Sequence, residues 1–376
     1  MCYEGRRVPR EMKLGLGLYR HQLNEEHYRF ARQCGCTHVI VHLVDYFRSS
    51  RSNKPGDQPV GDDSGWGLAG DPRKLWSYEE LAALRKDINA AGLELEAIEN
   101  FDPAHWHDVL LDGPRKREHL ENVKTIIRNV GRAGIPVMAY NFSIAGVTGR
   151  VKGPFARGGA EAVGMDGAFE KPMPAGMAWN MVVDRKAKGT ELAATHEELW
   201  GRLKVFLDAV LPVAEEAGVT LAAHPDDPPM PTMRGQPRLV HQPRLYQRLL
   251  DLRPSARNML EFCVGTLAEM TEGDIYETVD TYSRQRKLAY VHLRNVRGKV
   301  PHYKETFIDE GDVDMVRVLR ILHRNGFKGV VIPDHAPQMS CDAPWHAGMA
   351  YALGYIRAAQ QMIEGERGGD TKDNHD

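Results

Sequence analysis

Residues Thr195 to Pro225 read THEELWGRLKVFLDAVLPVAEEAGVTLAAHP and contain one complete helix–strand unit. The opening Thr-His-Glu-Glu is a capping box, in which the threonine and the second glutamate satisfy backbone N–H groups at a helix N-terminus. Gly218 then supplies the left-handed residue that ends a helix. The apolar run Thr220–Pro225 predicts a buried strand, and His224 lies near its carboxyl end. This stretch therefore predicts an α/β protein in which helices and strands alternate.

The same unit recurs along the chain, because short β-rich runs alternate with longer amphipathic stretches, as in βα units around a parallel sheet. Eight such runs are present: Lys13–Leu18, His38–Leu43, Glu94–Glu99, Val137–Phe142, Thr220–Pro225, Asn258–Cys263, Ala289–Arg294 and Gly329–Asp334. Eight parallel strands close a barrel, so we predict a (β/α)8 TIM barrel. The alternative is a doubly wound open sheet, since strand counts taken from one sequence are error-prone.

Local signals between the runs agree with this prediction. Ser77-Tyr-Glu-Glu80 is a second capping box, and Gly92, Gly134 and Gly326 each precede a predicted strand. Helix starts and stops thus fall where the barrel requires them.

Two long segments interrupt the alternation. Arg48–Gly70 is rich in Gly, Asp, Ser and Pro, and Ser143–Asp184 is long and has no clear period. Both follow predicted strands, so we expect both over the carboxyl-terminal mouth of the barrel, where the active sites of such barrels lie. Loops of this length are usually lids or binding loops, and we expect 143–184 to be a lid. The first segment is equally consistent with a surface insertion or an oligomer contact.

The rest of the chain predicts one catalytic domain over residues 1–364, followed by a disordered polar tail, Gly365–Asp376. The start, MCYEGRRVPREMK, lacks the apolar core of a signal peptide, and no run reaches the ~18 apolar residues that span a bilayer. The sequence thus predicts a cytoplasmic protein without a membrane partner.

Charge and cysteine content narrow the function classes. Lys and Arg number 49 against 51 Asp and Glu, a net charge of -2, so no basic field exists to hold nucleic acid. Five cysteines, an odd number, argue against a disulfide framework and for reduced thiols or a metal ligand. We expect a small-molecule partner, with a homo-oligomer left open.

The last four predicted strands each end in a potential metal ligand. The four side chains are His224, Cys263, His292 and Asp334. A barrel directs the carboxyl ends of its strands to one mouth, so donors distant in sequence converge there. Taken singly, each residue has an ordinary structural explanation, such as a hydrogen-bonded rim histidine or a small buried cysteine. Four in register favour a metal site, and a thiolate with two imidazoles and a carboxylate suits Zn²⁺ or Fe²⁺.

Neighbouring polar residues complete the predicted mouth. If the strand ends at Asp334, His335 opens the following loop and can act as a general acid or base; the alternative is that it only caps the loop. Arg294 is a candidate for holding a substrate carboxylate and Asn295 lies beside it, although Arg294 could also be a surface charge. Asp226-Asp227 is a candidate hydrogen-bond partner for the His224 ring, but a plain turn is favoured there.

Several of these stretches resemble mannonate dehydratases. The similar stretches run in order from about Trp76 to Gly354: AGLELEAIENFD, IRNVGRAGIPVMAYNF, LAAHPDDPP, RGQPRLV, YVHLRNVRG, YKETFIDEGDVDM and PDH. The resemblance implies a metal-dependent barrel, related in architecture to xylose-isomerase-like enzymes, that converts D-mannonate to 2-keto-3-deoxy-D-gluconate. It also implies Mn²⁺, with Fe²⁺ as the alternative and Zn²⁺ less favoured.

Carried over to this chain, the resemblance places the metal ligands on His224, Cys263, His292 and Asp334, and an acid/base histidine on His335. Asn141, within the fourth predicted strand, and Arg150, beyond it, are further candidates for substrate binding.

The chain also departs from the family pattern. Where the family has a proton-transferring tyrosine, the sequence reads APWHAGMAY, with Trp345 and His346 near the expected position and Tyr351 further on. We therefore expect His346 or a tyrosine to act with His335. The family's Trp-Thr-Arg-Thr run is replaced by VTGRVKG, in which Arg150 is the remaining arginine.

The predicted reaction is a β-elimination of water from a sugar acid. One alternative is a sugar isomerase or epimerase on the same scaffold, which would return the proton instead of expelling water. Others are a dehydratase acting on a different aldonate and a non-catalytic sugar-binding protein, and the latter would not need a complete set of metal ligands.

Overall fold

Eight parallel strands form a closed barrel in the computed structural model, which describes residues 12–50, 58–60 and 63–370. In chain order these strands are β1 (Lys13–Leu18), β2 (His38–Val41), β3 (Glu94–Glu99), β4 (Val137–Tyr140), β9 (Thr220–Ala223), β12 (Asn258–Cys263), β13 (Leu288–His292) and β16 (Val330–Ile332). Their order around the barrel is β1-β16-β13-β12-β9-β4-β3-β2. β1 pairs with both β2 and β16, so the sheet has no open edge and the predicted barrel is confirmed.

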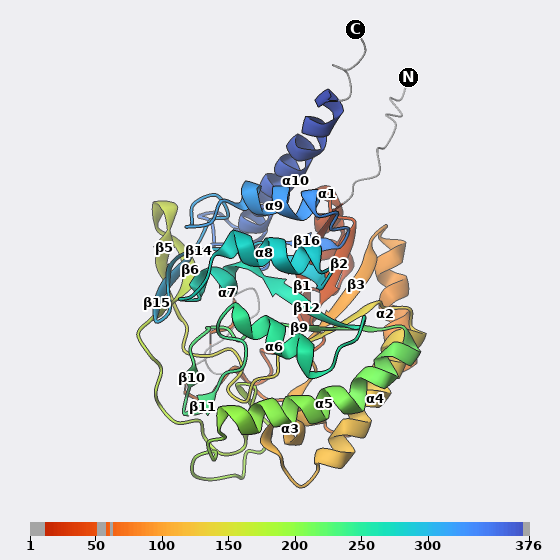
Figure 1. Ribbon diagram of the computed structural model, residues 1–376, viewed down its shortest axis with the longest axis vertical. Helices are drawn as coiled ribbons and strands as arrows, with labels where there is room; N and C mark the ends of the chain where they lie inside the picture. Colours follow the sequence, from red (N-terminus) through yellow and green to blue (C-terminus); the bar gives the residue numbers. More distant parts are fainter. Residues whose placement is uncertain (1–11, 51–57, 61–62, 371–376) are drawn as a thin grey trace.

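Helices wrap the outside of the barrel (Figure 1). They are α1 (Glu25–Gln33), α2 (Tyr78–Ala90), α3 (Pro103–Leu111), α4 (Lys116–Arg132), α5 (His196–Ala217), α6 (Arg244–Leu252), α7 (Val264–Glu269), α8 (Ile275–Arg284), α9 (Met315–Arg324) and α10 (Pro344–Asp370). Short 3-10 turns lie at η1 (Arg20–Gln22) and η2 (Arg157–Gly159). The main apolar core lies between the strands and these helices, where residues such as Leu16, Val39 and Phe206 are fully buried.

The helix–strand unit quoted from the sequence forms as its local signals predict. Thr195 accepts a hydrogen bond from the backbone of Glu198, whose carboxylate accepts one from the Thr195 N–H. Gly218 ends α5 in the left-handed conformation, with φ of 71°. β9 begins two residues later and delivers His224 to the carboxyl end of the barrel.

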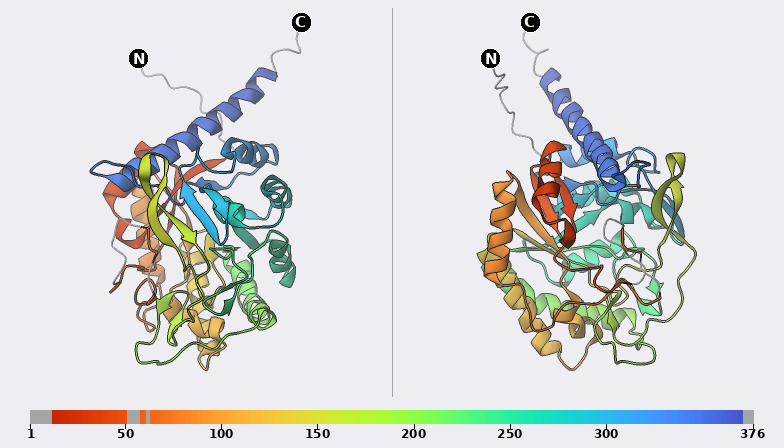
Figure 2. Two further views of the ribbon diagram at one scale, coloured as in Figure 1. Left: turned by 90° about the vertical axis from the view of Figure 1, so that its left-hand side faces the viewer. Right: turned by 180° about the vertical axis from the view of Figure 1, so that it is seen from behind.

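The segment 143–184 is not an irregular loop. It contains β5 (Val151–Ala156), β6 (Ala160–Asp166) and a small hairpin of β7 (Met177–Ala178) and β8 (Met181–Val182). β5 and β6 join β14 (Asn295–Lys299) and β15 (His302–Thr306) in a four-stranded sheet of order β14-β15-β6-β5. This sheet stands at one side of the barrel (Figure 2). A further short hairpin, β10 (Thr232–Met233) with β11 (Gln236–Pro237), follows β9.

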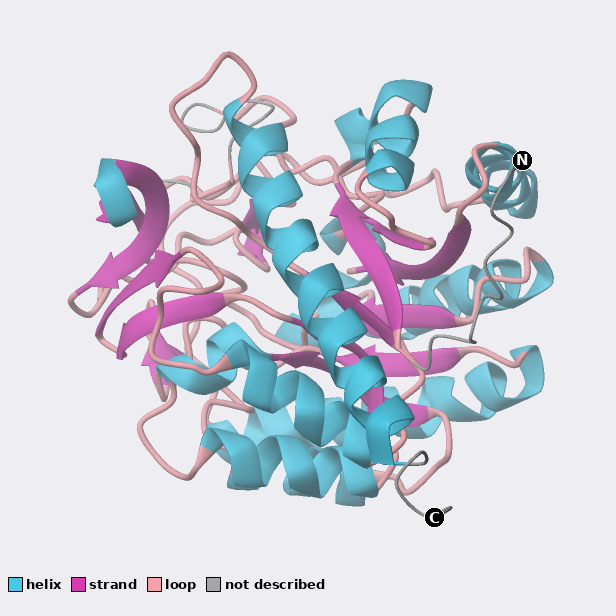
Figure 3. Cartoon of the chain, turned by 90° about the horizontal axis from the view of Figure 1, so that it is seen from above, coloured by secondary structure: helices cyan, strands magenta, loops and turns pink. Residues whose placement is uncertain are grey.

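The long helix α10 crosses the molecule in Figure 3 and its carboxyl end projects beyond the barrel in Figure 1. It extends to Asp370, so the first part of the stretch expected to be a disordered tail, from Gly365 to Asp370, is helical. Residues 371–376, and residues 51–57 and 61–62 of the Arg48–Gly70 segment, lie outside the described residues. Within the described ranges, no helix combines the length and apolarity needed to cross a bilayer.

The capping box of α5 gives a stability test. Thr195→Ala removes the side-chain acceptor at the helix start, and we expect a loss of about 1 kcal/mol in the free energy of unfolding. Thr125→Ala in α4 is the matched control, because Thr125 is exposed inside a helix, where alanine is favoured. The measurement is urea unfolding followed by circular dichroism. Equal losses in the two variants would show that the cap is not the cause.

Candidate active site

Four potential metal ligands meet at the carboxyl ends of consecutive barrel strands. His224 follows β9 directly, and Cys263 and His292 are the last residues of β12 and β13. The donor atoms of these three side chains lie within 4.8 Å of one another. Asp334, two residues after β16, places Oδ2 3.5 Å from His292 Nδ1 and 4.0 Å from Cys263 Sγ. The structure thus brings together the four residues that the strand-end argument selected.

The chemistry of these donors fits a divalent transition metal. Burial alone would raise the pKa of the Cys263 thiol, but the Arg294 guanidinium and the neighbouring histidines lower it well below its usual value, towards the ligating thiolate. Both ring nitrogens of His292 are buried and have no aligned hydrogen-bond partner among the described residues. Its Nε2 lies 3.2 Å from Glu261 Oε1, so a carboxylate faces the ring nitrogen opposite Asp334.

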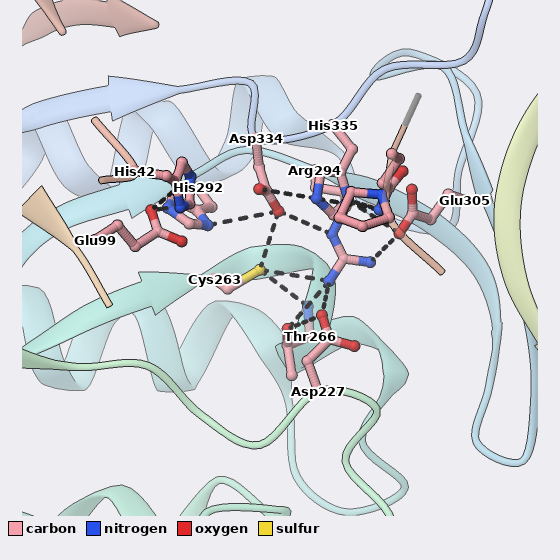
Figure 4. A network of polar contacts seen from close by, with 12 residues as sticks. His42, Glu99, Asp227, Cys263, Thr266, His292, Arg294, Glu305, Asp334 and His335 are labelled. Carbon is pink, nitrogen blue, oxygen red and sulfur yellow. Dashed lines mark hydrogen bonds and ion pairs between the residues drawn. The ribbon is translucent and has the colours of Figure 1, made fainter. Parts of the chain in front are cut away.

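Arg294 lies beside these donors and is 2% exposed. Its guanidinium donates to a ring of acceptors that includes Asp334 (3.2 Å), Glu305 (3.0 Å), Glu269 (2.6 Å) and Asp227 (2.8 Å), as Figure 4 shows for all but Glu269. Thr266 Oγ1 and Cys263 Sγ also accept hydrogen bonds from it. All of its N–H groups are therefore used, and the expectation that Arg294 holds a substrate carboxylate is corrected.

The two candidate asparagines support the backbone. Asn295 Nδ2 donates to the carbonyl oxygens of Ile308 and Val313, 2.8 Å each, and its side chain is buried away from the cavity. Its expected role in substrate binding is therefore corrected as well. Asn141 does line the cavity, but its amide donates to Pro225 O (2.9 Å) and accepts from the indole N–H of Trp179 (3.1 Å). It holds the turn that carries His224.

Asp334 and His335 both face the site although they are adjacent in sequence. Asp334 has a left-handed φ of 59° beyond the end of β16, which turns the backbone between the two side chains. His335 Nδ1 lies 3.2 Å from Glu305 Oε1, and its Nε2 lies 3.3 Å from Asp334 Oδ1. Burial opposes ionisation of Glu305, but His335 and Arg294 lower its pKa below the usual value. A carboxylate on β15 therefore orients the His335 ring.

Both long segments reach this site. The Gln58 amide lies 3.1 Å from His335 Nε2, and Arg150 Nη2 donates to Pro59 O (3.0 Å). Arg150 is buried, lines the cavity, and has an Nε without a partner among the described residues. Unlike Arg294, it keeps an unused donor.

His346 lies elsewhere. It is in the first turn of α10, where its ring packs 4.8 Å from the ring of Phe30 and 5.3 Å from that of His27, both in α1. Tyr351 on the same helix places its hydroxyl 3.4 Å from Arg157 Nη2. Neither residue lines the cavity, so the expected catalytic role of His346 is corrected: α10 starts too far along the loop after β16 to return its side chain to the mouth.

The cavity around these groups has a volume of about 60 Å³. Its wall includes residues that the sequence did not single out: Tyr19, His42, Tyr46, Trp66, Glu99 and Trp179. Tyr19, His42 and Glu99 stand at or just beyond the ends of β1, β2 and β3, so the strand-end rule, applied to all eight strands, would have found them. A larger cavity of about 600 Å³ beside α2 contains none of the metal donors.

A second group of potential ligands lies at the junction of α3 and α4. It consists of His107, Asp108 and His119. His119 Nδ1 accepts a hydrogen bond from Asp108 N (3.1 Å), and Asp108 Oδ2 accepts from Arg115 N (2.8 Å). Burial, with His107 nearby, lowers the pKa of His119 to about 4. Its lone pair is already used, so we assign this group to helix packing.

Fold and site together define a (β/α)8-barrel enzyme with a polar pocket at the carboxyl ends of its strands. The family profile described as D-mannonate dehydratase matches residues 37–157 and 175–365. The chain belongs to the D-mannonate dehydratase family. The unmatched residues 158–174 lie within the 143–184 segment and include β6.

Individual relatives agree with the family profile. Mannonate dehydratase of Streptococcus equi subsp. zooepidemicus is 31% identical over 276 residues, 70% of this chain and 75% of the relative. That of Oceanobacillus iheyensis is 30% identical over 338 residues, 84% and 90% of the two chains. The crystal structure of mannonate dehydratase from Streptococcus suis serotype 2 superimposes with a TM-score of 0.73 at 25% identity, covering 95% of each chain. An L-ribulose 3-epimerase, 14% identical with a TM-score of 0.55, covering 97% of this chain and 99% of its own, shares the fold.

The convergence of donors predicts metal binding directly. We expect about one divalent metal ion per chain, most of which Cys263→Ser and His292→Ala each lose, because each variant removes a donor. His346→Ala is the control and should keep its metal, since His346 packs against α1. The measurement is elemental analysis of purified, Mn²⁺-loaded protein. Full metal content in both ligand variants would contradict the site.

Proposed function

We propose that this chain dehydrates a sugar acid, converting D-mannonate to 2-keto-3-deoxy-D-gluconate and water. The observation that carries the proposal is the convergence of His224, Cys263 and His292, with Asp334 beside them, at the mouth of a barrel of the mannonate dehydratase family. Two imidazoles, a thiol and a carboxylate would not need to lie so close together if each only stabilised the fold.

These four residues would hold a divalent ion, for which we propose Mn²⁺, with Fe²⁺ as the alternative. Zn²⁺ suits the set less well as a catalytic ion, because four protein ligands would close a tetrahedral zinc site. When bound, the ion would polarise the substrate carboxylate and an adjacent hydroxyl and offset negative charge that develops there. Every remaining step is assigned to side chains of the chain itself.

Arg150 is the proposed anchor for the substrate carboxylate, because it is buried in the cavity wall and retains an unused N–H group. His335 is the proposed base for the C2 proton. Glu305 at its Nδ1 fixes the ring, which leaves Nε2, on the side of Asp334, to take the proton from substrate.

The test is turnover of Mn²⁺-loaded protein on D-mannonate and then on other aldonates, with detection of the 2-keto-3-deoxy product. We expect His335→Asn to keep its metal and lose about 10²–10⁴-fold in kcat, the usual contribution of a general base. Asp334→Asn should lose metal instead. If the wild-type protein released no such product, or interconverted epimers without losing water, the proposed reaction would be wrong.

We also propose that segment 143–184 is a lid. Small-molecule sites usually have volumes of about 300–1,000 Å³, whereas this cavity has about 60 Å³, so a six-carbon acid needs the walls to move. The segment supplies Val147, Arg150 and Trp179 to the wall. β6 also pairs with the loop after β16, where Gln338 N donates to Glu161 O (2.8 Å).

A reversible lock tests the lid. Glu161→Cys with Gln338→Cys, in a Cys341→Ser background, places two thiols at a paired antiparallel position suitable for a disulfide. We expect oxidation to lower kcat/KM by about tenfold or more, because the site must open to admit substrate, and reduction to restore it. The two single-cysteine variants are the controls and should not respond. An oxidised double variant with unchanged kcat/KM would contradict a lid that opens at this contact.

A further inference from the structure

Expulsion of a hydroxyl group requires a proton donor as well as a base. Hydroxide is a poor leaving group, so a general acid must protonate the departing oxygen. His335 supplies one of these two functions in the proposed dehydration, and His346 lies outside the cavity. If dehydration is the function, as proposed above, another side chain of the cavity must act as the general acid.

Most proton-bearing groups of the cavity wall are already committed to protein partners. The Tyr46 hydroxyl accepts a hydrogen bond from Asn100 Nδ2 (3.1 Å) and lies 3.2 Å from His42 Nδ1. His42 Nε2 lies 3.7 Å from Glu99, which also faces His292. These residues hold one another in place and have little freedom to give up a proton.

Asp227, another acidic residue of the wall, is likewise unavailable. Its carboxylate accepts hydrogen bonds from Arg294 (2.8 Å) and from Thr266 Oγ1 (3.2 Å). Burial opposes its ionisation, but Arg294 and Arg150 lower its pKa below the usual value, so it carries no proton to give.

Tyr19 is different. It follows Leu18, the last residue of β1, and lines the same cavity as Asp334 and His335. Its ring is held by aromatic contacts, 5.0 Å from the ring of His42 and 6.0 Å, edge to face, from that of Tyr46. Its hydroxyl makes no hydrogen bond within the described part of the chain, and the side chain keeps some exposed surface. Aromatic contacts therefore fix the Tyr19 ring, and its hydroxyl has no hydrogen-bond partner among the described residues.

The surroundings keep this hydroxyl protonated. Burial, followed by the negative charge of Asp334, raises the pKa of Tyr19 well above the ordinary value for a phenol. An ordinary phenol, with a pKa of about 10, is a far stronger acid than water, whose pKa is about 15.7, so a phenol can give its proton to a departing hydroxide. Tyr19 thus has the properties of a donor rather than of a base.

We infer that Tyr19 is the general acid of the elimination. As the C2 proton passes to His335, the electrons of the C2–H bond form the C2–C3 double bond and the C3–O bond breaks. The departing oxygen takes the proton of the Tyr19 hydroxyl and leaves as water. His335 is then an imidazolium and Tyr19 a phenolate, and proton exchange with solvent restores both while the enol product becomes the ketone.

The experiment separates acid from base with two substrates. Tyr19→Phe, Tyr28→Phe and His335→Asn are compared, each Mn²⁺-loaded, on the best aldonate and on its 3-deoxy-3-fluoro analogue, since fluoride leaves without a proton. Tyr19→Phe should lose about 10²–10⁴-fold in kcat for loss of water, with KM and metal content unchanged. On the fluoro analogue it should lose less than tenfold. His335→Asn should fail on both substrates.

Tyr28→Phe is the matched control, because it removes a phenol hydroxyl from α1, outside the cavity; its kcat should fall less than tenfold on both substrates. Urea unfolding of Tyr19→Phe should be unchanged, since its hydroxyl has no hydrogen-bond partner among the residues that the structure describes. Near-normal water loss by Tyr19→Phe, or equal losses on both substrates, would overturn the inference. Wild-type protein inactive on every aldonate would instead overturn the proposed function.

Discussion

The charge balance around Arg294 is the interaction on which the site depends. One buried guanidinium holds together the end of β13, α7 through Glu269, β15 through Glu305 and the loop after β16 through Asp334. Buried acidic groups without a counterion cost several kcal/mol each, and the Arg294 guanidinium offsets part of that cost where these elements meet. The same positive charge favours the thiolate of Cys263. One guanidinium therefore both holds the elements of the barrel mouth together and favours the thiolate form of Cys263.

The four-stranded sheet brings residues from outside the eight barrel strands to this site. β14 and β15 follow β13, whereas β5 and β6 follow β4, and the two pairs meet through β15 and β6. Their pairing brings Glu305 and Arg150 to His335 from segments more than a hundred residues apart. The family profile does not match residues 158–174, which include β6 of this sheet.

Sequence reasoning succeeded where the signals were local. Strands and helix caps follow from short-range patterns, so all eight strands were found, and the strand-end rule located Cys263 and its companions. It failed where a side chain chooses among partners distant in sequence. Arg294 and Asn295 lie just beyond the end of β13, yet acidic groups and carbonyl oxygens that only tertiary structure supplies occupy their donors. His346 lies near the family's tyrosine position in sequence, but its ring packs against α1 and not at the mouth. Tyr19 lies one residue beyond β1, and a tyrosine at a strand end gives no metal-ligand signal in the sequence.

Closure of the barrel also constrains the order in which the chain can fold. β1 pairs with β16 through Lys13 and Val330, so the first strand has an unpaired edge until almost the whole chain has been synthesised. Gln360 of α10 then donates to Met12 O at the start of β1. Contacts of such long sequence separation form slowly, and an unpaired strand edge invites association with other chains. A nascent polypeptide of this architecture thus exposes one edge of β1 until β16 has been synthesised and has paired with it.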